Sequence, residues 1–229
     1  MDDDENDGED GRNCKVVLLG ESGVGKTSII SQYTRKKFNP RCSTSVSAQF
    51  ISKIIEFPEF EKSIKFDIWD TVGQEKYRSL TKIFYRDAKV IVFVYDITKE
   101  YSFNAIKDYW YQESLNTTEE TPIFALVANK SDLYVDQKIN NKDGKELAEK
   151  MNAIFQTTSA LLDTGINNLF ENIGKKILMP DYDYRNIDNS AQKDYSKKRQ
   201  QEKKDKKIKL ENQNNNENAN EKKKTCCGS

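Results

Sequence analysis

Apolar residues along most of the chain fall into two alternating patterns, short apolar runs and longer segments with helical spacing. Residues 90–95 and 123–128 are continuously apolar, as in strands that are buried on both faces of a parallel sheet. Residues 62–69 instead alternate apolar and polar side chains, which is typical of a half-buried strand. Six segments are predicted to be strands: residues 15–19, 48–57, 62–69, 90–95, 123–128 and 154–157.

Helices are predicted between these strands, at residues 28–33, 103–115, 144–151 and 166–177. In the second of them, apolar side chains recur at Phe103, Ile106, Trp110 and Leu115. Because strands and helices alternate, we expect an α/β fold, a doubly wound and mostly parallel six-stranded sheet. The turn at Pro58 would join the second and third strands as an antiparallel hairpin, so that one strand runs against the others.

The charge pattern separates the ends of the chain from its middle. The 37 basic and 37 acidic residues cancel overall, yet residues 2–10 hold acids without bases, and bases dominate residues 193–209. Four parts are therefore expected: a disordered acidic arm at 1–13, one globular domain at 14–178, a flexible tether at 179–225 and a short end at 226–229. A solvated tail without function is the simplest interpretation of the arm.

The composition limits the chemistry. The chain has no histidine, so histidine-based acid–base catalysis and the usual histidine metal sites are excluded, and its four cysteines do not have the spacing of a metal site. No window offers the ~18 apolar residues of a membrane-spanning helix, and the acidic N-terminus is unlike a secretory signal. We therefore expect a domain in the cytosol or on its membrane surfaces, without nucleic acid as a partner. Its chemistry would come from backbone dipoles, amides, carboxylates and a hard metal ion.

Residues 20–27, GESGVGKT, match the phosphate-binding pattern G-x-x-x-x-G-K-[ST] and are called the P-loop below. They follow a predicted strand and precede a predicted helix, which is the context that the pattern requires. Glycines let successive N–H groups point at one anion, and the helix N-terminus adds partial positive charge. Lys26 is expected to reach the β- and γ-phosphates, and Thr27 to bind Mg²⁺. The alternative is a glycine-rich turn that binds nothing.

Three further polar segments come directly after predicted strands, at residues 70–75, 129–132 and 158–160. The carboxyl ends of strands in an open α/β sheet line one crevice, so these segments and the P-loop are expected to share a site. Residues 129–132, Asn-Lys-Ser-Asp, are called the NKSD loop. The Asp132 carboxylate can accept from the adjacent N1–H and amine of guanine, whereas adenine would leave that charge unpaired. Taken alone, the NKSD loop could also be a charged surface turn.

Together these motifs resemble the Ras-like small GTPases. GESGVGKT, WDTVGQE, NKSD and TSA occur in the order of that family, and the resemblance covers residues 14–178. Its details are similar to the Rab branch: Trp69 precedes Asp70, EKYRSL follows Gln74, FYRDA occupies residues 84–88, and two cysteines stand near the end. The resemblance implies a GTPase that cycles between GTP- and GDP-bound states and recruits effectors in vesicle trafficking.

The resemblance also implies roles for single residues. Gln74 would orient the attacking water, and Thr27, Ser45 and Asp70 would hold Mg²⁺. No arginine finger is evident, so unaided hydrolysis is expected to be slow, at about 10⁻⁴ s⁻¹, until an activating protein assists. The implied nucleotide-binding residues are Glu21, Ser22, Gly23, Val24, Gly25, Lys26, Thr27, Ser28, Phe38, Ser45, Asp70, Gly73, Asn129, Lys130, Asp132, Ser159, Ala160 and Leu161.

Three residues depart from the family pattern. Ser45 stands where the family has the Mg²⁺-binding threonine, although Thr44 is adjacent. Val72 replaces an alanine beside the γ-phosphate, and Leu161 replaces a lysine beside the base. Ser45 and Val72 motivate an alternative function, a hydrolysis-poor and mostly GTP-loaded docking module on membranes. An ATP-dependent kinase is a weaker alternative, because the NKSD loop opposes adenine.

Three aromatic residues align with the patch through which Rab-like proteins meet effectors: Phe50, Trp69 and Phe84. Aromatic side chains that are exposed together are plausible binding hot spots. Ordinary core or hairpin aromatics are the alternative interpretation.

The chain ends in Cys226-Cys227-Gly228-Ser229, which formally fits C-a-a-X. The pair is more similar to the double-cysteine ending of Rab-like proteins, which receives two geranylgeranyl groups. Two lipids anchor stably, and each residue of Lys222–Lys224 would add about 1 kcal/mol near an anionic leaflet. The protein is thus expected on the cytoplasmic face of an intracellular or plasma membrane, with a chaperoned cytosolic pool. Two unmodified thiols are the alternative.

The partners implied by the resemblance are guanine nucleotides, proteins and, through the lipid anchor, a membrane. GTP and GDP would bind together with Mg²⁺. An exchange factor and a GTPase-activating protein would change the nucleotide state. Effectors would bind the exposed surface, and a prenyl-chaperone protein would bind the lipid end.

Overall fold

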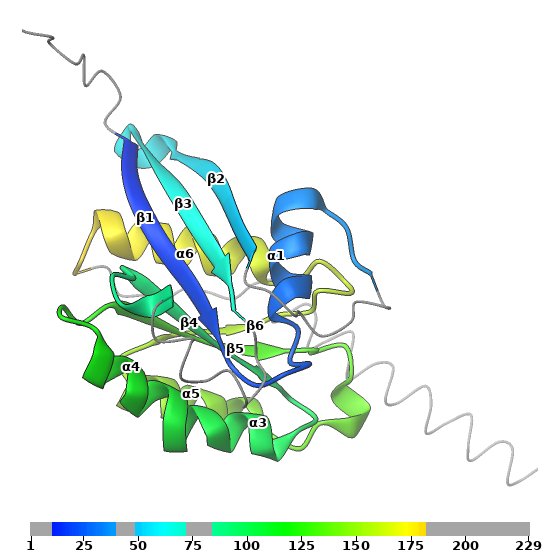
Figure 1. Ribbon diagram of the computed structural model, residues 1–229. Coiled ribbons are helices and arrows are strands. Elements are labelled where there is room, and N and C mark those ends of the chain that lie inside the picture. The colour runs from blue at the N-terminus through cyan, green and yellow to red at the C-terminus, as the bar shows by residue number, and fades with distance from the viewer. Residues whose placement is uncertain (1–10, 40–48, 72–83, 182–229) are drawn as a thin grey trace, which may run out of the picture. The chain divides into compact units, whose positions relative to one another are not determined.

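The computed structural model describes residues 11–39, 49–71 and 84–181, whose arrangement Figure 1 shows. The elements within these ranges are β1 (Gly11–Leu19), α1 (Lys26–Arg35), β2 (Gln49–Phe57), the 3₁₀ turn η1 (Pro58–Phe60), β3 (Lys62–Asp70), β4 (Val90–Asp96), α3 (Glu100–Ala105), the π-helical turn η3 (Ile106–Trp110), α4 (Tyr111–Thr117), β5 (Ile123–Asn129), the 3₁₀ turn η4 (Tyr134–Asp136), α5 (Asn141–Lys150), β6 (Ile154–Thr157) and α6 (Ile166–Leu178). None of the helices in the described ranges has both the length and the apolar character that a membrane crossing needs.

The strands form a six-stranded sheet in the order β2-β3-β1-β4-β5-β6. β2 and β3 pair antiparallel, and the other neighbouring strands pair parallel. The predicted α/β class with one antiparallel strand is therefore confirmed. β1 begins at Gly11, inside the range that the sequence assigned to the acidic arm. The chain places β3 on one side of β1 and β4 on the other, and open sheets bind ligands at such a reversal of strand order.

Helices cover both faces of the sheet, which explains why β4 and β5 are apolar up to their last residues. Leu18 points to one face, where it shares a core with Ile29 of α1 and Phe170 of α6. Leu19, the next residue, points to the other face and packs in a core with Trp110, beneath α3 to α5. Successive side chains of a strand alternate between faces, so a strand covered on both sides must be apolar at every position. Figure 1 shows α1 and α6 on one side of the strands and α3 to α5 on the other.

The helix predicted over residues 103–115 differs from the prediction. It is α-helical at both ends and π-helical at Ile106–Trp110. Trp110, which is 1 % exposed, and Ser114 are both on the buried face of this helix. Leu115 is 38 % exposed. The apolar residue five positions after Trp110 therefore misses the buried face, because α-helical periodicity continues four positions on.

Candidate functional site

The P-loop joins β1 to α1 in a backbone path that requires glycine at two positions. Gly20 has φ +143° and Gly25 has φ +102°, in the region that side chains disfavour. A Cβ atom at Gly20 would lie 2.2 Å from the Val94 carbonyl oxygen, and one at Gly25 would lie 2.3 Å from Asn129 Nδ2. α1 begins directly after Gly25 without a side-chain cap, and the N-terminus of a helix attracts anions through its first N–H groups.

Lys26, the first residue of α1, points its ammonium into this loop. The residue is 5 % exposed, and its Nζ donates to the carbonyl oxygens of Gly20 at 2.8 Å and Glu21 at 3.1 Å. Burial lowers the pKa of Lys26 to about 8, although the carboxylates of Asp70 and Glu21 act to raise it. A buried cation beside a helix N-terminus is the electrostatic arrangement that favours phosphate.

Thr27 and Asp70 meet at the mouth of the P-loop. The Thr27 hydroxyl donates to Asp70 Oδ2 at 2.5 Å, and Asp70, the last residue of β3, is 2 % exposed. A hydroxyl and a carboxylate are hard oxygen ligands, so this pair fits Mg²⁺ by its chemistry. Ser45, the third predicted ligand, lies outside the described residues.

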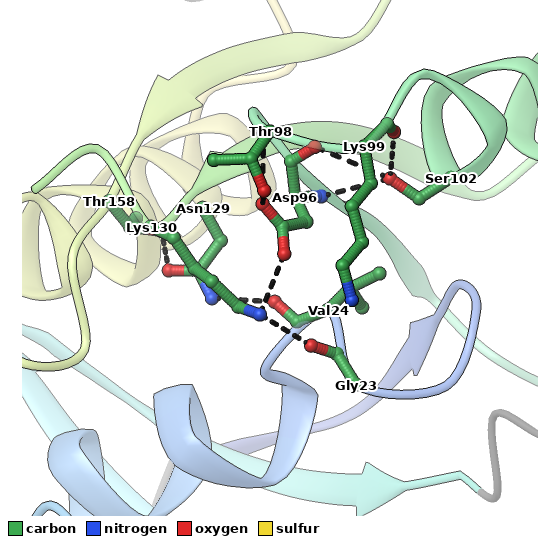
Figure 2. Close-up of polar contacts among 9 residues, drawn as sticks. All are labelled: Gly23, Val24, Asp96, Thr98, Lys99, Ser102, Asn129, Lys130 and Thr158. Atoms are coloured by element: carbon green, nitrogen blue, oxygen red, sulfur yellow. Dashed lines mark hydrogen bonds and ion pairs between the residues drawn. The ribbon is translucent and has the colours of Figure 1, made fainter. Parts of the chain in front are cut away.

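The NKSD loop begins with Asn129, the last residue of β5, and is hydrogen-bonded to two other segments. Asn129 Nδ2 donates to the carbonyl oxygen of Val24 in the P-loop at 2.8 Å, and Thr158 Oγ1 donates to Asn129 Oδ1 at 3.0 Å (Figure 2). Ser159 Oγ donates to Asp132 Oδ1 at 2.5 Å. The structure therefore brings together the P-loop, the NKSD loop and the segment after β6, which the sequence predicted to share one crevice.

Lys130 also connects the NKSD loop to the P-loop. Its Nζ donates to the Gly23 carbonyl oxygen at 2.7 Å and pairs with Asp96 Oδ2 at 2.7 Å (Figure 2). Asp96 is a buried carboxylate that the sequence analysis did not assign to the site. Its position as the acid that ends β4, a neighbour of β5, is the signal that could have identified it, because Asp96 and Asn129 are partners in the β4–β5 register.

Trp110 is a second residue that sequence reasoning missed. Its indole N–H donates to the Glu21 carboxylate at 3.1 Å, across the 89 residues that separate them. Glu21 is 8 % exposed, so its negative charge within the P-loop is held away from water. Trp110 is the last residue of a π-helical turn, and π-helical turns are frequent at functional sites.

The remaining predicted residues lie in different surroundings. Ser159 and Ala160 are buried, whereas Phe38 is 36 % exposed and Leu161 is 54 % exposed. Those predicted residues that lie outside the described ranges are Ser45, Gly73, Gln74, Cys226 and Cys227.

The three aromatic residues of the predicted effector patch contact one another. The ring centroids of Phe50 and Trp69 are 5.1 Å apart, and those of Trp69 and Phe84 are 5.8 Å apart. Phe50 is 51 % exposed, and Lys15 Nζ lies 5.7 Å from the Trp69 ring centroid. The cluster thus spans β2, β3 and the segment before β4, with Phe50 at the surface.

A P-loop connected to an NKSD loop at the carboxyl edge of a doubly wound sheet defines a P-loop protein that binds guanine nucleotides. The Ras family profile matches residues 15–179 of the chain. Ras-related protein Rab-22A of Mus musculus is 37 % identical over 166 residues, which cover 72 % of this chain and 84 % of that protein. The chain therefore belongs to the Ras family, and it is a Rab-like small GTPase, an enzyme that hydrolyses GTP.

Two further relatives are similar to this chain to about the same degree. Ras-related protein RABA1g of Arabidopsis thaliana is 37 % identical over 163 residues, which cover 71 % of this chain and 74 % of that protein. Ras-related protein RabC of Dictyostelium discoideum is 35 % identical over 157 residues, which cover 69 % of this chain and 80 % of that protein.

The bond from Trp110 to Glu21 gives the first testable prediction. Trp110→Phe keeps an aromatic ring and removes the N–H donor, which leaves a buried carboxylate with one donor fewer. We expect the free energy of unfolding in urea to fall by about 1–3 kcal/mol. In the Glu21→Gln background the same change should cost less, because the charge is gone. Trp69→Phe is the matched control, and an equal loss from both tryptophan variants would contradict the assigned bond.

Proposed function

We propose that the crevice between the P-loop and the NKSD loop binds Mg²⁺ with GTP or GDP. The phosphates would lie at the P-loop, against the N-terminus of α1 and the Lys26 ammonium. Thr27, Asp70 and Ser45 would hold the Mg²⁺ ion, which supplies charge neutralisation between the phosphates when bound. The observation that carries this proposal is the direct bonding of Asn129 and Lys130 to P-loop carbonyls.

The base would lie at the NKSD loop. Asp132 would accept hydrogen bonds from guanine N1–H and from its exocyclic amine. Its other contact, the hydroxyl of Ser159, supports this role because it fixes the orientation of the carboxylate. Phe38 and Leu161, both partly exposed, would provide apolar walls for the ring.

Asp132→Asn tests the assignment of the base. The parent should bind GDP about 10- to 100-fold more tightly than IDP, which lacks the exocyclic amine, because a hydrogen bond to a charged group contributes about 1.5–3 kcal/mol. In Asp132→Asn the affinity for GDP should fall, and the GDP-to-IDP ratio should approach one. Competition of both nucleotides against a fluorescent GDP measures this ratio.

The exposed Asp136→Asn, four positions along, is the matched control and should behave as the parent. An unchanged GDP-to-IDP ratio in Asp132→Asn would rule out this carboxylate as the guanine contact.

Hydrolysis would follow from positioning rather than from covalent chemistry. Gln74 would orient the attacking water, and Lys26 with the P-loop amides would stabilise charge on the γ-phosphate. Turnover would be slow without an activating protein, because an arginine finger supplied in trans contributes several powers of ten. The role of Gln74 is inferred from its position after Asp70 and Gly73 in the sequence. Residues 72–83 lie outside the described ranges.

Gln74→Leu should trap the GTP-bound state. We expect single-turnover hydrolysis to slow by at least about tenfold, because the water loses its hydrogen-bonding partner. Gln112→Leu, an exposed change on α4, is the control and should leave the rate unaltered. If the parent's hydrolysis is accelerated by cytosolic extract, a Gln74→Leu rate equal to the parent's would refute the role of Gln74. A parent whose hydrolysis does not respond to cytosolic extract would instead favour the hydrolysis-poor docking module.

We propose that this chain acts in vesicle trafficking, a role that its similarity to Rab proteins supports. The aromatic cluster Phe50–Trp69–Phe84 would be the surface that effectors contact, which its mutual ring contacts and the exposure of Phe50 support. Cys226 and Cys227 would carry the lipids that hold the protein on the cytoplasmic face of a membrane.

A Cys226→Ser/Cys227→Ser double variant tests the anchor. In eukaryotic cells the tagged parent should sediment largely with membranes, whereas the double variant should stay in the supernatant because it cannot be prenylated. Cys42→Ser removes a thiol elsewhere and should sediment as the parent does. Equal sedimentation of parent and double variant would contradict the anchor.

A further inference from the structure

Asp96 is the buried end of a hydrogen-bond network beneath the NKSD loop. Its side chain is 1 % exposed, and it ends β4 directly beside Asn129 of β5. Its Oδ1 accepts from the Thr98 N–H at 2.9 Å and from the Thr98 hydroxyl at 2.7 Å. Its backbone N–H donates to Ser102 Oγ at 3.1 Å. The carboxylate is therefore held in one orientation by groups on its own loop (Figure 2).

The second carboxylate oxygen of Asp96 faces the ammonium of Lys130. The distance from Oδ2 to Nζ is 2.7 Å, and the Lys130 side chain is 29 % exposed. Burial raises the pKa of the Asp96 carboxyl, but hydrogen bonds from Lys130 and Thr98 outweigh it and hold that pKa below its ordinary value. The two oxygens thus have separate partners, Oδ1 for the loop of β4 and Oδ2 for the NKSD loop.

Lys130 has a backbone conformation that needs support. Its φ is +63°, in the left-handed region that a residue with a Cβ disfavours. Such conformations persist where surrounding contacts over-determine them. Here the ammonium is fixed from two sides, by Asp96 and by the Gly23 carbonyl oxygen of the P-loop. With its two ends fixed, the methylene stem of Lys130 has little freedom.

We propose that Asp96 is a positioning residue for nucleotide binding and acts through Lys130. Its charge draws the ammonium to the base of the crevice, so that the Lys130 stem forms a fixed wall for the purine ring. The same ion pair keeps the ammonium bonded to Gly23 and holds the P-loop at a set distance from the NKSD loop. This inference rests on the proposed binding of guanine nucleotides.

The dissociation rate of a fluorescent GDP analogue measures this role. Asp96→Asn preserves the shape of the side chain and removes its charge. We expect GDP release to accelerate about tenfold, the consequence of losing one interaction of ordinary strength. Asp67→Asn is the matched control, because this carboxylate on β3 accepts from Ser52 and lies among residues of the β2–β3 pair. It should release GDP as the parent does.

A double-mutant cycle with Lys130→Met separates positioning from a structural role. Methionine keeps an unbranched stem and lacks the ammonium. If Asp96 acts through Lys130, Asp96→Asn should change GDP release by less than about twofold in the Lys130→Met background. It should also raise the melting temperature of Lys130→Met, because it removes a buried charge that has lost its counterion.

A structural role in the β4 loop alone predicts the opposite results. Asp96→Asn would then accelerate GDP release equally with and without Lys130, and it would lower the melting temperature in both backgrounds. Either result overturns the proposal, as does an unchanged release rate in Asp96→Asn. A parent that fails to bind GDP at all would instead refute the proposed function.

Thr98→Val provides a milder second variant if Asp96→Asn does not fold. It removes the hydroxyl that donates to Asp96 Oδ1 and leaves the charge in place. GDP release should accelerate in the same direction by a smaller factor, because the carboxylate keeps its partner but loses part of its orientation. A release rate equal to the parent's would count against the proposal.

Discussion

The architecture of the site depends on two hydrogen bonds between segments that are more than a hundred residues apart. Asn129 and Lys130 donate to the carbonyl oxygens of Val24 and Gly23, so the loop after β5 is bonded directly to the loop after β1. In a trans peptide the N–H points opposite to the C=O, so the N–H groups that follow these carbonyls face away from the NKSD loop, on the side proposed for phosphate. The contacts on one side of the P-loop therefore stabilise the backbone orientation that phosphate binding needs on the other.

The site also concentrates buried charges, and those described here have partners on neighbouring elements. The Lys26 ammonium binds P-loop carbonyls, the Glu21 carboxylate accepts from Trp110, and Asp96 pairs with Lys130. A buried charge is costly without compensation, so these pairs fix the orientation of each group before a ligand arrives. Preorganised charges of this kind stabilise a triphosphate and its hydrolysis without a reorganisation cost at the moment of reaction.

Much of this arrangement could be predicted from the sequence, because its signals are local. The P-loop and the NKSD loop are continuous motifs, and the rule that strand ends share a crevice placed Asp70, Asn129 and Asp132 together. Trp110 could not be assigned in this way, because the π-helical turn that presents it to Glu21 is a tertiary feature without a sequence motif. Leu115 was misplaced for a different reason, because the helical spacing from Trp110 continues to the buried polar Ser114, whereas only apolar residues were counted toward the buried face.

We propose that this crevice selects guanosine phosphates through a base loop and a phosphate loop that are held as one unit. Calorimetric titration of the full chain, stripped of bound nucleotide with EDTA and returned to excess Mg²⁺, tests it most directly. We expect saturable binding of GDP with a Kd below about 1 μM, and no comparable heat from ADP. Equal affinity for the two nucleotides, or no binding of GDP by a correctly folded sample, would contradict it.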